Sequence, residues 1–238
     1  MAKQYFLIVD TETTQDGQVA DLGMVVCDRK GMIHHQAGIL VHGVFDNEQE
    51  HPLFFTQDAN PLWGRRGLPA RYARYNAMLN SGSRMLASVN AVNRWLERAR
   101  GQYNPTLTAY NLAFDTDKCG NTGIDLSIFS DRFCLWHAAA AKWGSTKNYR
   151  QFVLENVAFN KPTDKGNMSF QTNAEVMARF VTNNPELPDE PHTALEDAIY
   201  YELPILHKLV NTVPRKEYMD PPGYNWKDYQ VNQHFKPA

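Results

Sequence analysis

The sequence predicts an α/β fold whose mixed central sheet, an antiparallel meander plus parallel strands, is flanked by helices. Short apolar runs that suit buried strands occur at residues 4–10 and 107–110, and an amphipathic helical pattern lies between them at 83–100. The length of 238 residues suffices for one large α/β domain or two small ones. With 43% hydrophobic and 21% charged residues, the composition excludes disordered, collagen-like and disulfide-scaffold classes.

The first three strands are predicted to follow one another along the chain. The run QYFLIVD at 4–10 is typical of a buried central strand whose C-terminal end opens onto a site. Residues 19–28 and 32–41 are two further strand-like stretches, and the polar turn Arg29-Lys30-Gly31 separates them. A connection this short favours an antiparallel meander.

The middle of the chain is predicted to hold a long irregular excursion and then a helix. Over 45–75 the periodicity fails and prolines and glycines recur, so we expect a loop with one short helix. Loops of this length are usually functional or mobile. Over 83–100 apolar residues recur at steps of three and four with arginines between them, and Gly101 is expected to end this helix.

The second half of the chain is predicted to alternate strands with helices. The run at 107–110 is a second buried strand that stops at Asn111, and residues 133–136 form a third parallel strand. The last helix begins after Pro191, and Pro204 is expected to kink or break it. Further helical patterns occur at 137–143, 148–157 and 173–182.

We predict one domain over residues 1–210, with an arginine-rich insertion at about 45–82, and a C-terminal tail over 211–238. The tail mixes prolines with aromatic residues, and so many aromatic residues argue against a free disordered end. It is therefore expected to pack on the body or on a second subunit, in a monomer or a homodimer.

Cysteine usage and hydropathy indicate a cytoplasmic protein that does not enter a membrane. The three cysteines form no C-x-x-C pair, which argues against both a disulfide framework and a thiolate zinc site and favours a reducing compartment. No apolar run approaches the roughly 20 residues that span a bilayer. The apolar run at 5–9 is too short for a secretory signal.

Positive charge is concentrated in one segment although the net charge of the whole chain is −2. Residues 64–100 contain eight arginines and a single acidic residue, Glu97. The distribution of charge, rather than its sum, governs the binding of polyanions. Polyanion binding and cation binding can therefore occur in separate places on this chain.

Three short motifs place carboxylates at expected strand ends or helix starts. Asp10 and Glu12 close the first strand, and alternation of side chains puts them on one face. Asp115 follows the second buried strand, where an α/β sheet keeps its binding crevice. The plainer interpretations are solvated carboxylates at a strand end, and a helix start with Asn111 as its N-cap.

The third motif combines a histidine with a carboxylate. Thr193 and Glu196 have the T-x-x-E spacing of a capping box, so the helix is predicted to start at Thr193. His192 then lies just outside the helix, while Asp197 is fixed on it. A histidine that titrates near neutral pH can serve as a general base. The plainer interpretation of His192 is a surface residue that follows Pro191.

Taken together, these residues read as D-x-E, N-x-x-F-D and H-x-x-x-x-D. The local sequences IVDTETT at 8–14, YNLAFD at 110–115 and HTALEDA at 192–198 carry this pattern. It resembles the DEDDh subgroup of the DnaQ-like 3′-to-5′ exonucleases, which have an RNase H-like fold. The resemblance covers roughly residues 4–210. The tyrosine-type subgroup has tyrosine where this chain has Thr193, so the histidine subgroup is the better match.

The resemblance implies a metal-dependent 3′-to-5′ exonuclease that releases nucleoside 5′-monophosphates from single-stranded DNA or RNA. It implies two Mg²⁺ or Mn²⁺ ions per site, and oxygen-only ligands favour these cations over zinc. Two alternatives are a catalytically silent nucleic-acid-binding protein on the same fold and an endonuclease of the broader RNase H-like group. The implied metal ligands are Asp10, Glu12, Asp115 and Asp197, and His192 completes the five catalytic residues as the base that deprotonates the attacking water.

Residues that position the substrate are expected in the first two motifs and in the basic insertion. Residues 64–75 interleave four arginines with two tyrosines, a composition that binds single strands, although surface arginines are also common on solvated faces. Phe114 is interpreted as a core residue in preference to a stacking surface. The candidate substrate-binding residues are Thr11, Thr13, Thr14, Asn111, Phe114, Arg65, Arg66, Arg71 and Arg74.

Overall fold

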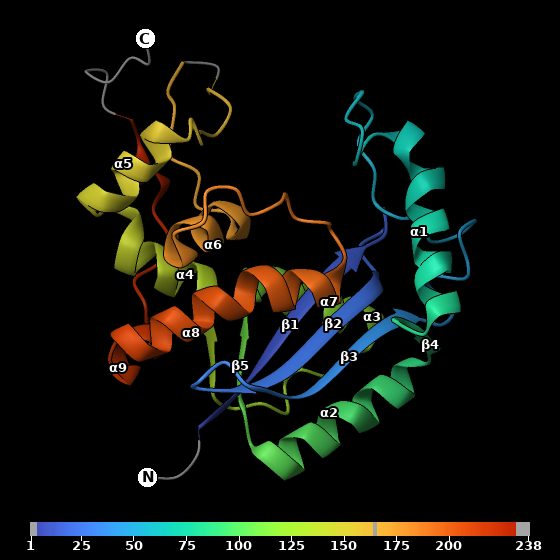
Figure 1. The fold of residues 1–238 in the computed structure, drawn as a ribbon. Helices are drawn as coiled ribbons and strands as arrows, with labels where there is room; N and C mark the ends of the chain where they lie inside the picture. Colours follow the sequence, from blue (N-terminus) through green and yellow to red (C-terminus); the bar gives the residue numbers. More distant parts are fainter. Residues whose placement is uncertain (1–3, 164–165, 232–238) are drawn as a thin grey trace.

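The computed structural model describes residues 4–163 and 166–231 and contains a mixed six-stranded sheet with the strand order β4-β3-β2-β1-β5-β6 (Figure 1). β1, β2 and β3 pair antiparallel, whereas β5 pairs parallel to β1, β6 to β5 and β4 to β3. The strands are β1 Tyr5–Thr13, β2 Val19–Asp28, β3 Ile33–Val41, β4 Met85–Ala87, β5 Thr106–Ala109 and β6 Arg132–Cys134. The predicted mixed sheet with its antiparallel meander is confirmed, as is the α/β class.

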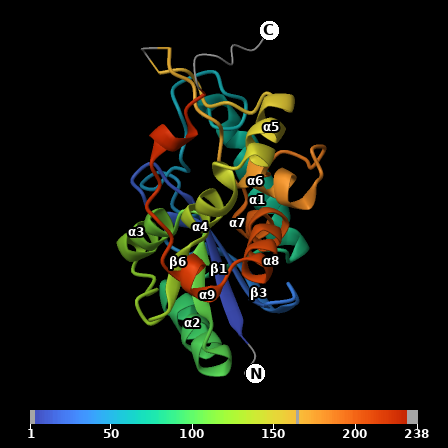
Figure 2. The same cartoon turned by 90° about the vertical axis from the view of Figure 1, so that its left-hand side faces the viewer.

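Helices cover both faces of the sheet (Figures 1 and 2). The α-helices are α1 Leu68–Ser81, α2 Val89–Tyr103, α3 Leu112–Thr122, α4 Leu135–Ala139, α5 Lys147–Glu155, α6 Ala174–Thr182, α7 Ala194–Asp197, α8 Leu203–Thr212 and α9 Arg215–Met219. Two π-helical segments, η2 Ala140–Gly144 and η3 Ala198–Glu202, and two 3-10 segments, η1 Arg65–Gly67 and η4 Trp226–Tyr229, complete the described elements.

Strand β1 is buried on both faces, so it reads as a continuous apolar run rather than an alternating one. Phe6 and Ile8 pack into the core that also includes α4 to α8. Leu7 and Val9 pack into the opposite core, formed with α1, α2 and α3. The central position of β1 therefore holds the acidic residues near its C-terminal end on a rigid element.

The bounds predicted for the helix at 83–100 are wrong at both ends. Residues 85–87 form the edge strand β4, and α2 starts only after Ser88, whose side chain accepts a hydrogen bond from the N–H of Ala91. Gly101 lies inside α2, which ends at Asn104 in the left-handed region, with φ 42°. The apolar spacing correctly predicted a helix in this region. It did not reveal that residues 85–87, expected in the first turn of that helix, pair as a strand instead.

The insertion contains a longer helix than expected. α1 has 14 residues, includes a proline in its first turn, and ends at Gly82 with φ 78°. It stands beside the edge of the sheet that carries β4 (Figure 1). The third parallel strand is also shorter than expected, because residues 135 and 136 already belong to α4.

Pro204 does not break the last helix. α7, η3 and α8 run on without interruption from Ala194 to Thr212, and Pro204 lies in the first turn of α8. Proline lacks the N–H that an α-helix interior requires, and the π-helical turn immediately before it accommodates this gap.

The C-terminal segment packs against the body as far as the structure describes it. Tyr218 and Tyr229 are buried, and the Tyr224 ring stacks on that of Tyr229 at 4.8 Å. Residues 232–238 of the expected tail lie outside the described residues. None of the described helices is both long enough and apolar enough to cross a membrane.

Candidate active site

The C-terminal end of β1 and the start of α3 bring two motifs together. The Thr11 hydroxyl, between Asp10 and Glu12, donates a hydrogen bond to Asp115 Oδ1 at 2.8 Å. Asp115 lies in the first turn of α3, which starts just beyond the parallel strand β5. This is the end of the sheet at which α/β proteins bind their ligands.

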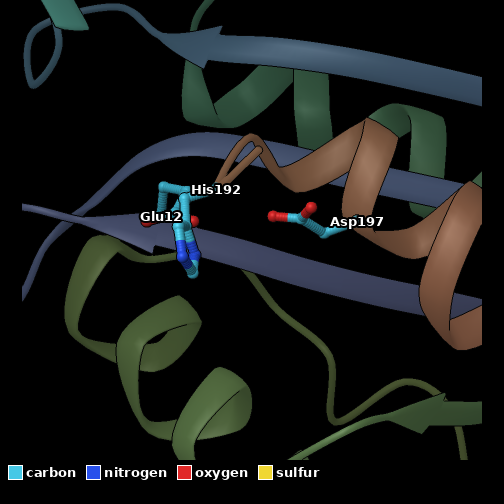
Figure 3. Close-up of side chains that lie close together, drawn as sticks. All are labelled: Glu12, His192 and Asp197. Carbon is cyan, nitrogen blue, oxygen red and sulfur yellow. The ribbon is translucent and has the colours of Figure 1, made fainter. Parts of the chain in front are cut away.

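The third motif completes the cluster. Glu12 from β1, His192 from the segment before α7, and Asp197 from the end of α7 each present a ligand atom, and these atoms lie within 4.8 Å of one another (Figure 3). Asp10 and Asp115 are close enough for their charges to act on one another. All five residues singled out from the sequence therefore meet at one place.

Helix α7 is held on β2 by main-chain contact and by a buried ion network. A Cβ atom on Gly23 would lie 2.3 Å from the carbonyl oxygen of Ala194, so only glycine allows this approach. The N–H of Ala194 donates to Asp21 Oδ2 at 3.0 Å. Arg84 bridges Asp21, at 2.8 Å, and Glu196, at 3.1 Å, and thereby joins β2 to α7.

The predicted capping box does not form, although Thr193 does occupy the N-cap position. Its side chain accepts no capping hydrogen bond, and Glu196 is engaged by Arg84 instead. The Asp197 carboxylate accepts from the N–H of Thr193 at 2.9 Å, and Asp21 supplies the other cap. The N–H of Thr193 is thus capped from within the helix, and the N–H of Ala194 is capped from a distant strand.

The variant Gly23→Ala is expected to destabilise the protein by about 1–3 kcal/mol, because the added methyl group overlaps backbone rather than a movable side chain. Gly120→Ala in α3 is the matched control, since nothing lies within 4 Å of a Cβ there, and it should gain about 0.5–1 kcal/mol. Urea unfolding measures both variants. Equal stability of Gly23→Ala and the wild type would contradict this seating of α7.

Burial raises the pKa of every carboxyl group in the cluster, and the charges of neighbouring carboxylates add to this at Asp10, Glu12 and Asp197. Burial is the largest cause in each case, and it raises the pKa of Glu12 to about 8, Asp115 to about 7 and Asp197 to about 9. The pKa of Asp10 is also raised, by burial and then by the charges of Glu202 and Asp115. At neutral pH such a site carries protons unless cations replace them.

The donor set fits hard divalent cations. Within the described residues, Asp197 Oδ1 is buried and has no hydrogen-bond partner. Asp10, Glu12 and Asp115 add further carboxylate oxygens, and oxygen ligands suit Mg²⁺ or Mn²⁺. Unpartnered buried carboxylate oxygens of this kind are what a metal ion would satisfy.

Two further carboxylates near the site escaped the sequence analysis. Glu202 is buried, with Oε1 accepting from the N–H of Tyr110 at 3.3 Å and Oε2 unpartnered within the described chain. Burial raises the pKa of Glu190 to about 7. Glu202 was missed because residues five apart on an α-helix differ by about 140° in direction, so only the π-helical turn brings it near the cluster that includes Asp197.

His192 is held in a constrained conformation. Its φ of 52° lies in the left-handed region, which costs a non-glycine residue of order 1–3 kcal/mol. Its ring lies 4.6 Å from that of Trp63 in the insertion. Burial, followed by the positive charges of Arg71 and Arg74, lowers the pKa of His192. The imidazole is therefore neutral near pH 7 and can accept a proton.

A groove of about 480 Å³ opens beside the cluster and has the size of a small-ligand site. Phe54 and Phe114 are 39% and 41% exposed at its wall. The placement of Phe114 in the core is therefore wrong, and Lys118 Nζ lies 5.3 Å from the centre of its ring. The groove is lined by Thr11, Glu12, Thr13, Thr14, Gln15, Gly17, Phe54, Trp63, Phe114 and Lys118.

The polar residues expected at the substrate divide into two groups. Thr13 lines the groove, whereas the hydroxyls of Thr11 and Thr14 are already engaged by Asp115 and Asp16. Asn111 occupies the N-cap position of α3 and is exposed, but its side chain makes no capping hydrogen bond. Because the hydroxyls of Thr11 and Thr14 already donate their protons, they can only accept hydrogen bonds from a ligand.

The four arginines of the insertion do not share one solvated face. Arg65 and Arg66 are exposed on η1, whereas Arg71 is buried. Arg74 Nη1 donates to the carbonyl of Pro191 at 2.8 Å, directly before His192. The insertion thus contacts the third motif itself.

Comparison with known proteins gives one structural likeness. No protein-family model matches the chain, and no curated protein matches it. Among solved structures, it is similar to E. coli Exonuclease I in complex with a 5cy-dT13 oligonucleotide, with 14% sequence identity and a TM-score of 0.45. The likeness covers 92% of this chain and 42% of the Exonuclease I chain, so this chain spans less than half of that protein's length.

Proposed function

We propose that this protein is a metal-dependent 3′-to-5′ exonuclease of the DEDDh type that acts on single-stranded DNA or RNA. The observation that carries the proposal is the meeting of Glu12, His192 and Asp197 within 4.8 Å, with Asp10 and Asp115 beside them. Three segments far apart in the sequence supply these residues. Their order, and the spacing of residues within each motif, resemble that subgroup, whereas insertions lengthen the intervals between the motifs.

The proposed metal ligands are the four carboxylates. The charges of Glu12, Asp115 and Asp197 all act on Asp10. A carboxylate with these neighbours would suit a ligand that both proposed ions share. The ions supply Lewis-acid stabilisation of the attacking and leaving oxygens in an in-line displacement at phosphorus. The carboxylates orient the ions, and the Thr11 hydroxyl fixes the direction of Asp115.

His192 is the proposed general base. Its lowered pKa leaves a ring nitrogen free to accept the proton of the attacking water at neutral pH. Contact with the Trp63 ring, which is tilted by 59° to the imidazole, limits the positions that the imidazole can take. The surrounding carboxylates then stabilise the imidazolium that forms.

The groove supports a single-stranded end as the substrate. Phe54, Trp63 and Phe114 offer aromatic faces on which bases stack without sequence preference, and Lys118 adds positive charge beside them. The volume suits a terminal nucleotide rather than a duplex. Few side chains of the groove can hydrogen-bond to base edges, which favours an enzyme that accepts many nucleotide sequences.

A gel time course tests the proposal. Single-stranded DNA and RNA of one sequence, labelled at the 5′ end, are incubated with Mg²⁺, with Mn²⁺ and with EDTA. A ladder that shortens from the 3′ end only when metal is present is the expected result. Binding without any cleavage would overturn it in favour of a catalytically silent nucleic-acid-binding protein, and internal cuts would indicate an endonuclease.

The variant His192→Ala separates a general base from a metal ligand. As a base, its loss should lower kcat by about 10²–10⁴-fold and leave the metal-induced rise in melting temperature intact. Replacing exposed His207 by alanine is the matched control. A lost thermal shift in His192→Ala would mean that this histidine binds the metal.

A further inference from the structure

A buried guanidinium without a carboxylate partner lies beside the candidate active site. Arg71 of α1 is 9% exposed, its Nη1 donates to the carbonyl of Phe54 at 2.5 Å, and its guanidinium carbon lies 4.5 Å from the centre of the Trp63 ring. Among the described residues, Arg71 has no ion-pair partner and its Nη2 has no hydrogen-bond partner. A buried cationic donor in this state is costly unless an anion joins it.

Arg71 lines a small cavity between α1 and the segment before α7. The cavity measures about 20 Å³, which is enough for one oxygen-sized atom. Tyr75, one turn further along α1, lines the same cavity, and its hydroxyl is also buried without a partner in the described chain. Arg74 adds a second positive charge, and His192 forms part of the wall.

We propose that this cavity receives one oxyanion of a phosphate group, bound by Arg71 Nη2 and the Tyr75 hydroxyl. The proposal rests on the proposed function, because it makes the insertion a phosphate-binding part of that same site. Guanidinium is the side-chain group best matched to phosphate oxygens, and a hydroxyl donor beside it completes the pair. An apolar or cationic ligand would leave both donors unsatisfied.

The residues around the cavity place a bound phosphate beside the proposed reaction centre. The positive charge of Arg71 acts on both Glu12 and His192, so an anion at its Nη2 lies next to the proposed metal ligands and the proposed base. Trp63, between Arg71 and His192, is within stacking distance of both. The phosphate belongs either to the backbone of the bound strand or to the nucleoside 5′-monophosphate that leaves.

Two tyrosines on one helix provide the test. Within residues 4–163 and 166–231 the Tyr75 hydroxyl has no partner, whereas the Tyr72 hydroxyl accepts a hydrogen bond from the N–H of Leu53 at 3.0 Å. Tyr75→Phe should leave the urea midpoint unchanged and weaken phosphate binding, and Tyr72→Phe should lower the midpoint and leave phosphate binding unchanged. Arg71→Met keeps the aliphatic stem of the side chain and removes the guanidinium, and exposed Arg98→Ala is its charge-matched control.

Calorimetric titration with inorganic phosphate in EDTA reads binding without turnover. We expect the Kd to rise by about tenfold in Arg71→Met and about threefold in Tyr75→Phe, and to stay unchanged in both controls. No saturable binding to the wild type, or equal affinity in all variants, overturns the proposal. If the wild type cleaves a labelled strand but does not bind phosphate, the subsite alone is rejected. If the wild type binds phosphate but cleaves no strand, the exonuclease alone is rejected.

The source of the phosphate follows from the same variants. Thymidine 5′-monophosphate and a dithymidine phosphodiester are titrated in turn. If Arg71→Met and Tyr75→Phe lose affinity only for the monophosphate, the cavity binds the product. If they lose affinity only for the phosphodiester, it binds the strand. Either result supports the proposal. Unchanged affinity for both probes overturns it.

Discussion

Asp10→Asn is expected to lower the rate of hydrolysis by about 10³-fold or more, while the metal-free variant melts at a higher temperature than the metal-free wild type. The loss of activity follows from removing the carboxylate shared by the proposed metal sites. The gain in stability follows because Asp10 is buried among Glu202, Asp115, Asp197 and Glu12, whose charges all oppose its ionisation. An amide of the same shape relieves that repulsion.

Activity on a 5′-labelled strand and thermal unfolding in EDTA measure the two effects. Glu97→Gln on α2 changes the same charge on an exposed surface and should alter neither. A wild-type rate in Asp10→Asn would exclude the site. A lower melting temperature in EDTA would show that Asp10 holds the fold together rather than straining it.

Metal ions are expected to remove the pH dependence of stability that this site causes. Folding raises the pKa of Glu12 from 4.5 to about 8 and that of Asp197 from 3.8 to about 9. A carboxyl group whose pKa is raised on folding stabilises the protein fully below its unfolded pKa, and this contribution is lost as pH rises through the folded pKa. In EDTA, the free energy of unfolding should therefore fall between about pH 4.5 and pH 9.

Saturating Mg²⁺ should remove this fall, because bound cations replace the protons. At about 100 times its Kd, one ion adds about 2.7 kcal/mol, which raises Tm by about 5–10 °C for a chain of this size. The rise should be larger at about pH 8.5 than at about pH 5.5, since fewer protons must be displaced. Thermal scans with Mg²⁺ and with EDTA at both pH values measure it, and an equal rise at both would contradict the raised pKa values.

The sequence was informative where local chemistry decides the structure. Asp10, Glu12, Asp115, His192 and Asp197 were identified from motifs, and the structure brings them together. The meander was predictable because a short polar turn, Arg29-Lys30-Gly31, separates its second and third strands. The 14-residue helix α1 was underestimated, because its proline and glycine neighbours resemble loop sequence and its stability comes from packing of residues such as Tyr75.

Long-range contacts account for what the sequence could not show. The cap on α7 comes from Asp21, 173 residues away, rather than from the local Thr193 and Glu196 pair. Glu202 reaches the cluster only because a π-helical turn changes the direction of its side chain. No pattern within either segment encodes the partner that the fold supplies.

The hydrogen bond between Ala194 and Asp21 also sets the earliest time at which a newly made chain can assemble the carboxylate cluster. At about 5–20 residues per second, ribosomes need roughly 10–35 s to synthesise the residues that separate these two partners. Until then the surface of β2 around Gly23 lacks the helix that packs on it, and the carboxylate cluster lacks Asp197. The cluster is therefore completed only late in synthesis, and any chemistry that depends on it begins only then.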